Sequence, residues 1–135
     1  MKIELTQKEF RRLLDLVYIG NWILNSARGG DRFADYDIIQ EKIFSNCREN
    51  GMEALIEEYL GQALPSKAYE DGGIHEAIAD YEDAVFFDIL AEELARRDMS
   101  EEQINTEDSE ELASRIEEYI CEFEKNGIEN ISLDI

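Results

Sequence analysis

Residues 6–24 read TQKEFRRLLDLVYIGNWIL and indicate a helix with a defined start. Thr6 and Glu9 have the spacing of a capping box, in which a hydroxyl and a carboxylate each satisfy a free amide of the first turn. Apolar residues then recur at helical spacing, at Phe10, Leu13, Leu14, Val17 and Leu24. We therefore expect a helix from Gln7 to about Arg28.

Similar patterns farther along the chain predict four more helices, separated by glycine, by proline or, before the last helix, by Asp98-Met99. Their expected ranges are Asp37–Asn50, Met52–Leu64, Ile74–Arg97 and Glu107–Lys125. Residues 65–73 are polar and contain glycine, which is typical of a loop. The sequence predicts a mostly α fold, a compact bundle of about five helices that forms a single domain over residues 1–135.

Both ends of the chain show a short alternating pattern that is typical of strands. Ile3 and Leu5 alternate with charged residues near the start, and Ile131 and Leu133 do so near the end. We expect these two segments to pair as a minor two-stranded β ribbon that packs on the helices.

The charge balance restricts the partners of the protein. The sequence holds 33 acidic and 13 basic residues, a net charge of −20. Nucleic acids and anionic membranes would be repelled, so we expect neither as a direct partner. The two cysteines, Cys47 and Cys121, lack metal or disulfide spacing, and we expect reduced, buried thiols in a cytoplasmic protein.

Catalytic motifs are absent from the sequence. His75 is the sole histidine, and positions 78 and 79, where a helical metal site would place its partner ligands, are Ile and Ala. Neither glycine pair has the Lys-Ser/Thr sequence of a phosphate-binding loop. We therefore expect no metal, no cofactor and no enzymatic activity.

Two segments carry a resemblance to known sequences. Residues 81–98 read YEDAVFFDILAEELARRD, and residues 18–22 read YIGNW. Together they resemble a family of small acidic prokaryotic helical proteins of unknown function. The resemblance covers about a quarter of the chain and implies no activity.

Polar residues interrupt the apolar second half of the first helix and are one candidate site. If they are buried, their side chains must be hydrogen-bonded, and they either line a small-molecule or enzymatic pocket or tie neighbouring backbone. An apolar helix of this kind also fits a homodimer interface, so the sequence is compatible with either a monomer or a homodimer. The residues of this pocket or interface are Ile19, Asn21, Trp22, Asn25 and His75.

The acidic last helix carries the leading functional hypothesis. Residues 98–135 hold 13 acids against Arg115 and Lys125. A helical face of this charge fits a non-enzymatic binding or regulatory module that meets a basic protein, as inhibitors, immunity proteins and nucleic-acid mimics do. The alternative is that the charge serves solubility alone. The candidate contact residues are Glu110, Glu111, Glu117, Glu118, Glu122 and Glu124.

Overall fold

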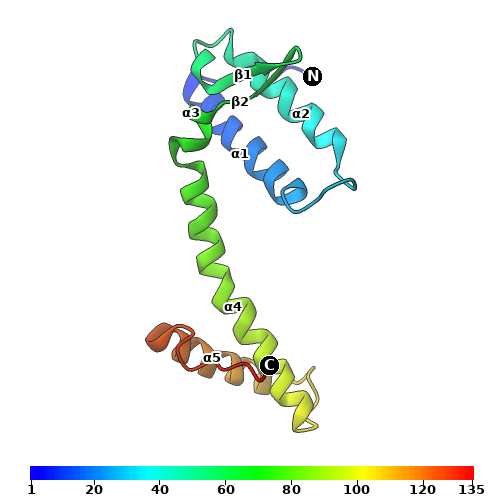
Figure 1. Cartoon of the computed structure of the whole chain (residues 1–135), viewed down its shortest axis with the longest axis vertical. Coiled ribbons are helices and arrows are strands. Elements are labelled where there is room, and N and C mark those ends of the chain that lie inside the picture. Colours follow the sequence, from blue (N-terminus) through cyan, green and yellow to red (C-terminus); the bar gives the residue numbers. More distant parts are fainter. The chain divides into compact units, whose positions relative to one another are not determined.

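The computed structural model describes residues 1–135 and consists mainly of helices, with one small antiparallel sheet (Figure 1). This confirms the mostly α fold with a minor β ribbon. The elements are α1 (Gln7–Asn25), α2 (Ala34–Phe44), β1 (Ile56–Tyr59), β2 (Gln62–Pro65), α3 (Lys67–Tyr69), α4 (His75–Glu101) and α5 (Ser109–Asn126). Short helical turns η1 (Ser45–Cys47), η2 (Glu53–Leu55) and η3 (Glu70–Ile74) connect some of them.

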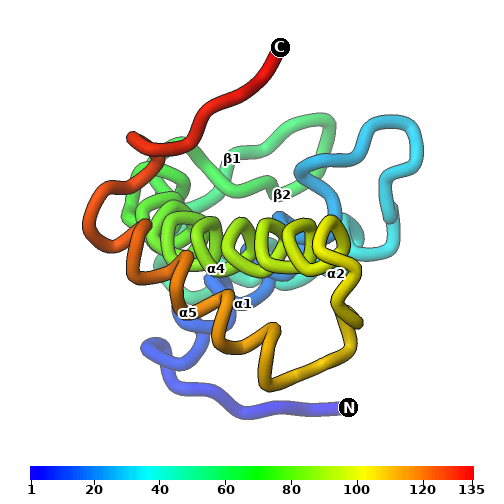
Figure 2. The backbone as a smooth tube through the Cα atoms, turned by 90° about the horizontal axis from the view of Figure 1, so that it is seen from below, coloured from blue at the N-terminus to red at the C-terminus, as the bar shows by residue number.

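The chain divides into two compact units, Met1–Ile78 and Ala79–Ile135. The boundary falls inside α4, which Figure 2 shows as an unbroken coil. The prediction that the whole chain forms a single domain stays a prediction. None of the helices is both long enough and apolar enough to cross a membrane.

Helix α1 begins where the sequence predicts. The Thr6 amide donates to the Glu9 carboxylate at 2.8 Å, and the Glu9 amide donates to the Thr6 hydroxyl at 3.2 Å, so both arms of the capping box form. One side of the helix lies in the core of the first unit. This core comprises Phe10, Leu14, Tyr18, Phe44, Cys47, Tyr69 and Ile74.

The predicted third helix, Met52–Leu64, is wrong, because this stretch contains the β hairpin. β1 and β2 pair with Ile56 opposite Pro65 and Tyr59 opposite Gln62. Leu60 and Gly61 form the two-residue turn with φ of 51° and 78°. A hairpin turn with two positive φ angles favours glycine at its second position, and a helix interior disfavours it.

Most of the segment after the hairpin is helical, up to a kink at Gly73 where φ is 110°, although its composition predicted a loop. The Ser66 hydroxyl accepts from the Tyr69 amide at 3.2 Å and donates to the Ala54 carbonyl at 2.6 Å. This cap starts α3 and directs Tyr69, 1% exposed, into the core. Burial, together with a hydrogen bond to Asp15, raises the pKa of Tyr69. Local capping therefore outweighs the polar composition.

The predicted ribbon between the chain ends is also wrong, since residues 1–5 and 131–135 form no strand. Ile3 and Leu133 are 69% and 79% exposed. Each segment offers only three apolar residues to a ribbon, which is little compensation for ordering its backbone. The only sheet is the hairpin within the first unit.

The second unit pairs part of α4 with α5. The Asp108 carboxylate caps α5 by accepting from the Glu111 amide at 3.1 Å. The buried residues are Ala91, Ala95, Met99 and Phe123. Cys121, predicted to be buried like Cys47, is exposed, because it lies outside the apolar stripe of α5 that contains Phe123.

A hydrogen bond between Tyr119 and Asp98 joins the two helices of this unit. The Tyr119 hydroxyl donates to the Asp98 carboxylate, and Arg97 also contacts this carboxylate at 2.7 Å. The Tyr119 hydrogen bond is the main cause that lowers the pKa of Asp98, and Arg97 adds to it. A group with a lowered pKa stabilises the fold above its unfolded pKa, and this contribution is lost as pH falls through the folded pKa.

We expect Tyr119→Phe to lower the free energy of unfolding at neutral pH by about 1–2 kcal/mol, since a hydrogen bond to a partly exposed charge is lost. The difference from the parent protein should shrink between neutral and acidic pH, as the pH falls through the lowered pKa of Asp98. Chemical denaturation followed by circular dichroism measures both values. Tyr81→Phe, which removes a hydroxyl from a 62% exposed side chain on α4, is the control. An equal difference at both pH values would contradict the assigned role of Asp98.

Candidate functional site

Asn25 joins α1 to the segment that leads into α2. Its side chain is 1% exposed. The side-chain oxygen accepts from the Phe33 amide at 2.8 Å, and the side-chain nitrogen donates to the Phe33 carbonyl at 3.1 Å. The same nitrogen donates to the side-chain oxygen of Asn21 at 2.6 Å. These contacts tie neighbouring backbone, which is the structural alternative that the sequence left open.

Asn21 continues this network into α2. Its side-chain nitrogen donates to Asp37 at 3.0 Å and to Gln40 at 3.2 Å. Arg32 forms two hydrogen bonds with the Asp37 carboxylate, at 2.6 and 2.7 Å. The Arg32 hydrogen bonds are the main cause that lowers the pKa of Asp37, and the Asn21 bond adds to it. The two asparagines and the ion pair thus fix the position of α2 against α1.

His75, the first residue of α4, packs on the aromatic side of α1. Its Nε2 shares a hydrogen bond of 2.7 Å with the Tyr18 hydroxyl. The ring also meets Trp22 edge to face, with centroids 4.8 Å apart. Burial and the nearby Glu70 carboxylate raise the pKa of Tyr18, so its hydroxyl stays protonated at neutral pH. The structure therefore places Trp22, His75 and both asparagines on or against α1.

A cavity of about 300 Å³ lies beside these residues. Its lining includes Tyr18, Trp22, Arg32, Gln40 and Glu70. The Tyr18 hydroxyl, the Arg32 guanidinium and the side-chain oxygen of Gln40 already bond to protein partners. A polar ligand would have to compete with these bonds, so the geometry favours a structural role for the polar cluster.

The residues predicted for self-association lie against the core. Ile19 and Trp22 are half-buried and pack on the core cluster. The apolar residues that α1 exposes are Leu16 and Ile23, 71% and 65% exposed. Their spacing of seven residues places them on one side of the helix, a signal that the sequence contains.

The structure divides the six candidate acids of α5 into two groups. Glu111 bonds to Arg115 at 2.7 Å, and Glu122 accepts hydrogen bonds from Asn130 and Asn126 that lower its pKa. These two side chains are half-buried and serve the unit itself. The other four are exposed and form no ion pair; they are Glu110, Glu117, Glu118 and Glu124.

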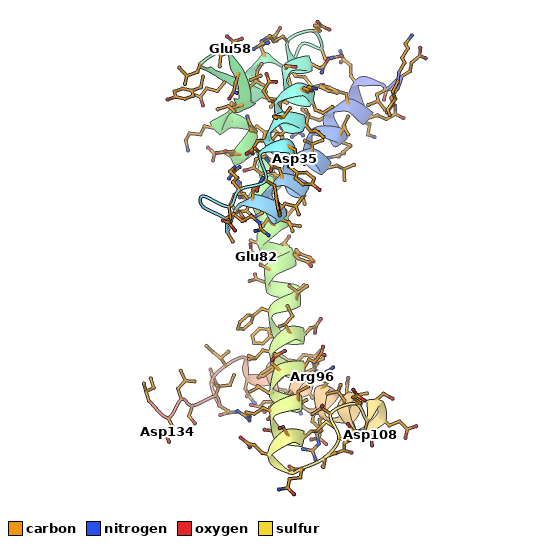
Figure 3. All side chains as sticks on the ribbon, turned by 90° about the vertical axis from the view of Figure 1, so that its right-hand side faces the viewer. Asp35, Glu58, Glu82, Arg96, Asp108 and Asp134 are labelled. Atoms are coloured by element: carbon orange, nitrogen blue, oxygen red, sulfur yellow. The ribbon has the colours of Figure 1, made fainter.

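Residues 79–135 are strongly acidic. Their 19 carboxylates and four basic residues give a net charge of −15. All three arginines of this unit are engaged in ion pairs, with Glu92, Asp98, Glu102 and Glu111. Figure 3 labels Arg96, one of these arginines, together with Asp108 at the start of α5. Most carboxylates of this unit therefore lack an internal counter-charge.

Sequence reasoning missed which side of α4 faces α5. Tyr81, Phe86 and Ile89 share the helical spacing of apolar residues, but their side chains are 62%, 51% and 59% exposed. Phe87 packs on Phe123 instead, with ring centroids 5.3 Å apart. Rows of apolar residues on both sides of α4 share the helical spacing, so periodicity alone does not decide between them.

No protein-family model, no curated protein and no solved structure matches the chain.

Proposed function

We propose that the protein is a non-enzymatic binding module that presents the acidic surface of residues 79–135 to a basic protein. One observation carries the proposal. Of the 19 carboxylates in this unit, 15 form no ion pair, because the arginines of the unit are all used by the other four. A cationic partner would supply the missing counter-charges.

The distribution of charge supports binding over solubility alone. Residues 1–78 hold 14 acids and nine bases, a net charge of −5, whereas the shorter second unit has a net charge of −15. A role in solubility requires no such concentration in one unit. A concentrated charge does accelerate the encounter with an oppositely charged surface, over a range of about 8 Å at physiological salt.

The four exposed acids of α5 are the proposed contact residues. They project from a helix whose other side is fixed to α4 by the packing of Phe123 on Phe87 and by the hydrogen bond from Tyr119 to Asp98, so their carboxylates are presented by a regular scaffold. Inhibitors, immunity proteins and nucleic-acid mimics of this type would present carboxylates to a lysine- and arginine-rich surface. The free thiols Cys47 and Cys121 accord with a cytoplasmic setting.

The test compares two variants with the same change in net charge. The first carries E110Q, E117Q, E118Q and E124Q on α5. The second carries E49Q, E53Q, E57Q and E76Q, four exposed acids of the first unit that form no ion pair. Tagged protein captures partners from its own cell lysate at low and high salt, mass spectrometry identifies them, and titration gives the affinity of each variant.

We expect a basic protein that is retained at low salt and released at high salt. The α5 variant should bind it at least about tenfold more weakly, and the first-unit variant should bind it nearly as well as the parent. Equal losses in both variants would show that only net charge matters and would overturn the proposed contact surface. Retention of no basic protein would overturn the proposal and favour the cavity beside Trp22 or self-association through α1.

A further inference from the structure

An apolar stripe lies on the side of α4 that does not pack on α5. It consists of Val85, Phe86 and Ile89, whose spacing of three and four residues places them on neighbouring turns of one side. Phe86 and Ile89 are 51% and 59% exposed. Apolar side chains are costly to hydrate, so a partner that covered this pair would gain free energy.

The Phe86 ring contacts the core of the unit through Phe87. Its ring meets Phe87 at a centroid distance of 5.0 Å, and Phe87 meets the buried Phe123 at 5.3 Å. This row of three rings restricts the position of Phe86 although half of its surface is exposed. A rigid aromatic side chain loses little conformational freedom when a partner covers it.

Carboxylates without ion pairs stand one turn beyond each end of the stripe. Glu82 precedes Phe86 by four residues, and Glu93 follows Ile89 by four residues. Both side chains are exposed, and neither forms an ion pair. Figure 3 labels Glu82 on α4. The helix thus presents an apolar centre between two anionic ends.

A second copy of this chain does not fit the stripe electrostatically. It would bring another unit with a net charge of −15 against the first, and like charges across an interface cost several kcal/mol. A helix with one apolar side and flanking lysines or arginines is complementary to both the centre and the ends. The stretch from Glu82 to Glu93 spans about 16 Å, roughly three helical turns, so a short helix suffices.

We propose that this stripe of α4 is a docking site for a cationic amphipathic helix of a partner protein. The inference rests on the proposed binding of a basic protein and specifies the partner's chemistry. The apolar side of the partner helix covers Phe86 and Ile89, and its basic residues pair with Glu82 and Glu93. This mode differs from purely electrostatic docking because it requires the apolar contact at any salt concentration.

The test uses the full chain and a fluorescein-labelled 14-residue peptide of leucine and lysine arranged to form an amphipathic helix. A peptide of the same composition in shuffled order, without an apolar side, is the reference. The main variant is F86A/I89A, and the matched control is L16A/I23A, which removes similar exposed apolar groups from α1. Circular dichroism verifies that each variant folds. If F86A/I89A does not fold, the single variant I89A replaces it in the binding test.

We expect the amphipathic peptide to bind the parent protein at least about tenfold more tightly than the shuffled peptide. F86A/I89A should lose that advantage, whereas L16A/I23A should keep it. Equal binding of both peptides, or an unaffected F86A/I89A variant, would overturn the inference. So would a homodimer in light scattering that F86A/I89A dissociates, since a second copy would then occupy the stripe.

The two proposals fail separately. The E110Q/E117Q/E118Q/E124Q variant tests the acidic surface of α5, and F86A/I89A leaves those four carboxylates in place. If the α5 variant keeps its basic partner while F86A/I89A loses the peptide, the contact surface of the proposed function is wrong and the docking site on α4 stands. If instead the α5 variant loses its basic partner while F86A/I89A keeps the peptide, the acidic contact surface stands and the docking site on α4 is wrong.

Discussion

Phe44→Ala is expected to lower the free energy of unfolding of residues 1–78 by about 3–5 kcal/mol. The Phe44 side chain has no exposed surface. Its ring meets Tyr69 edge to face at 5.1 Å, and it lies in the cluster with Leu14 and Cys47. Truncation removes this contact and leaves a cavity that helices α1 and α2 cannot close without shifting against each other.

Trp22 is the only tryptophan and lies in the first unit, so its fluorescence follows the unfolding of that unit in denaturant. Ile39→Ala is the matched control, because Ile39 lies on α2 like Phe44. Ile39 is also apolar, but its side chain is 53% exposed. The control should cost less than about 1 kcal/mol. Similar losses for the two variants would contradict the orientation of α2.

Helix positions were predictable where sequence signals were local. The Thr6–Glu9 capping box acts within one helix, and the structure confirms it. The last helix was predicted at about Glu107–Lys125 and is observed at Ser109–Asn126. The hairpin was not predicted, because its strands hold apolar residues at spacings that also fit a helix. Gly61 was the signal against a helix, since glycine in a helix interior costs about 1 kcal/mol relative to alanine.

The candidate site was predictable in part. The sequence identifies Asn21 and Asn25 as polar residues in an apolar helix, and the requirement that buried polar groups be hydrogen-bonded predicts partners for them. It does not identify those partners, because Phe33 and Asp37 reach the asparagines only once α2 has packed on α1. Sequence periodicity likewise does not decide which side of α4 packs on α5, because that depends on tertiary contacts.

The same reasoning applies to the acids of α5. Counting charges identifies six candidate carboxylates but does not separate exposed ones from those used internally. Glu111 is engaged because Arg115 lies four residues later, a spacing that the sequence shows. Glu122 is engaged by Asn130, which follows the end of the helix and depends on the turn after it. The structure therefore reduces the proposed contact set to the four free acids.

Asn25→Ala is expected to lower the free energy of unfolding of the first unit by about 2–3 kcal/mol. The change removes the acceptor of the Phe33 amide and one donor to the Phe33 carbonyl, and it leaves the side-chain oxygen of Asn21 without its donor. Alanine has the higher helix propensity, so the loss must come from these bonds and not from α1 itself.

Asn46→Ala is the matched control, since the exposed Asn46 side chain bonds only to carbonyls of the preceding turn, and we expect it to change stability by less than about 0.5 kcal/mol. Trp22 fluorescence in denaturant again measures both. A stability loss confined to Asn25→Ala, in protein without any added ligand, means that the asparagine holds the chain together. If both variants are equally stable, the Asn25 side chain is not needed for folding, and the result favours a ligand site in the cavity beside Trp22.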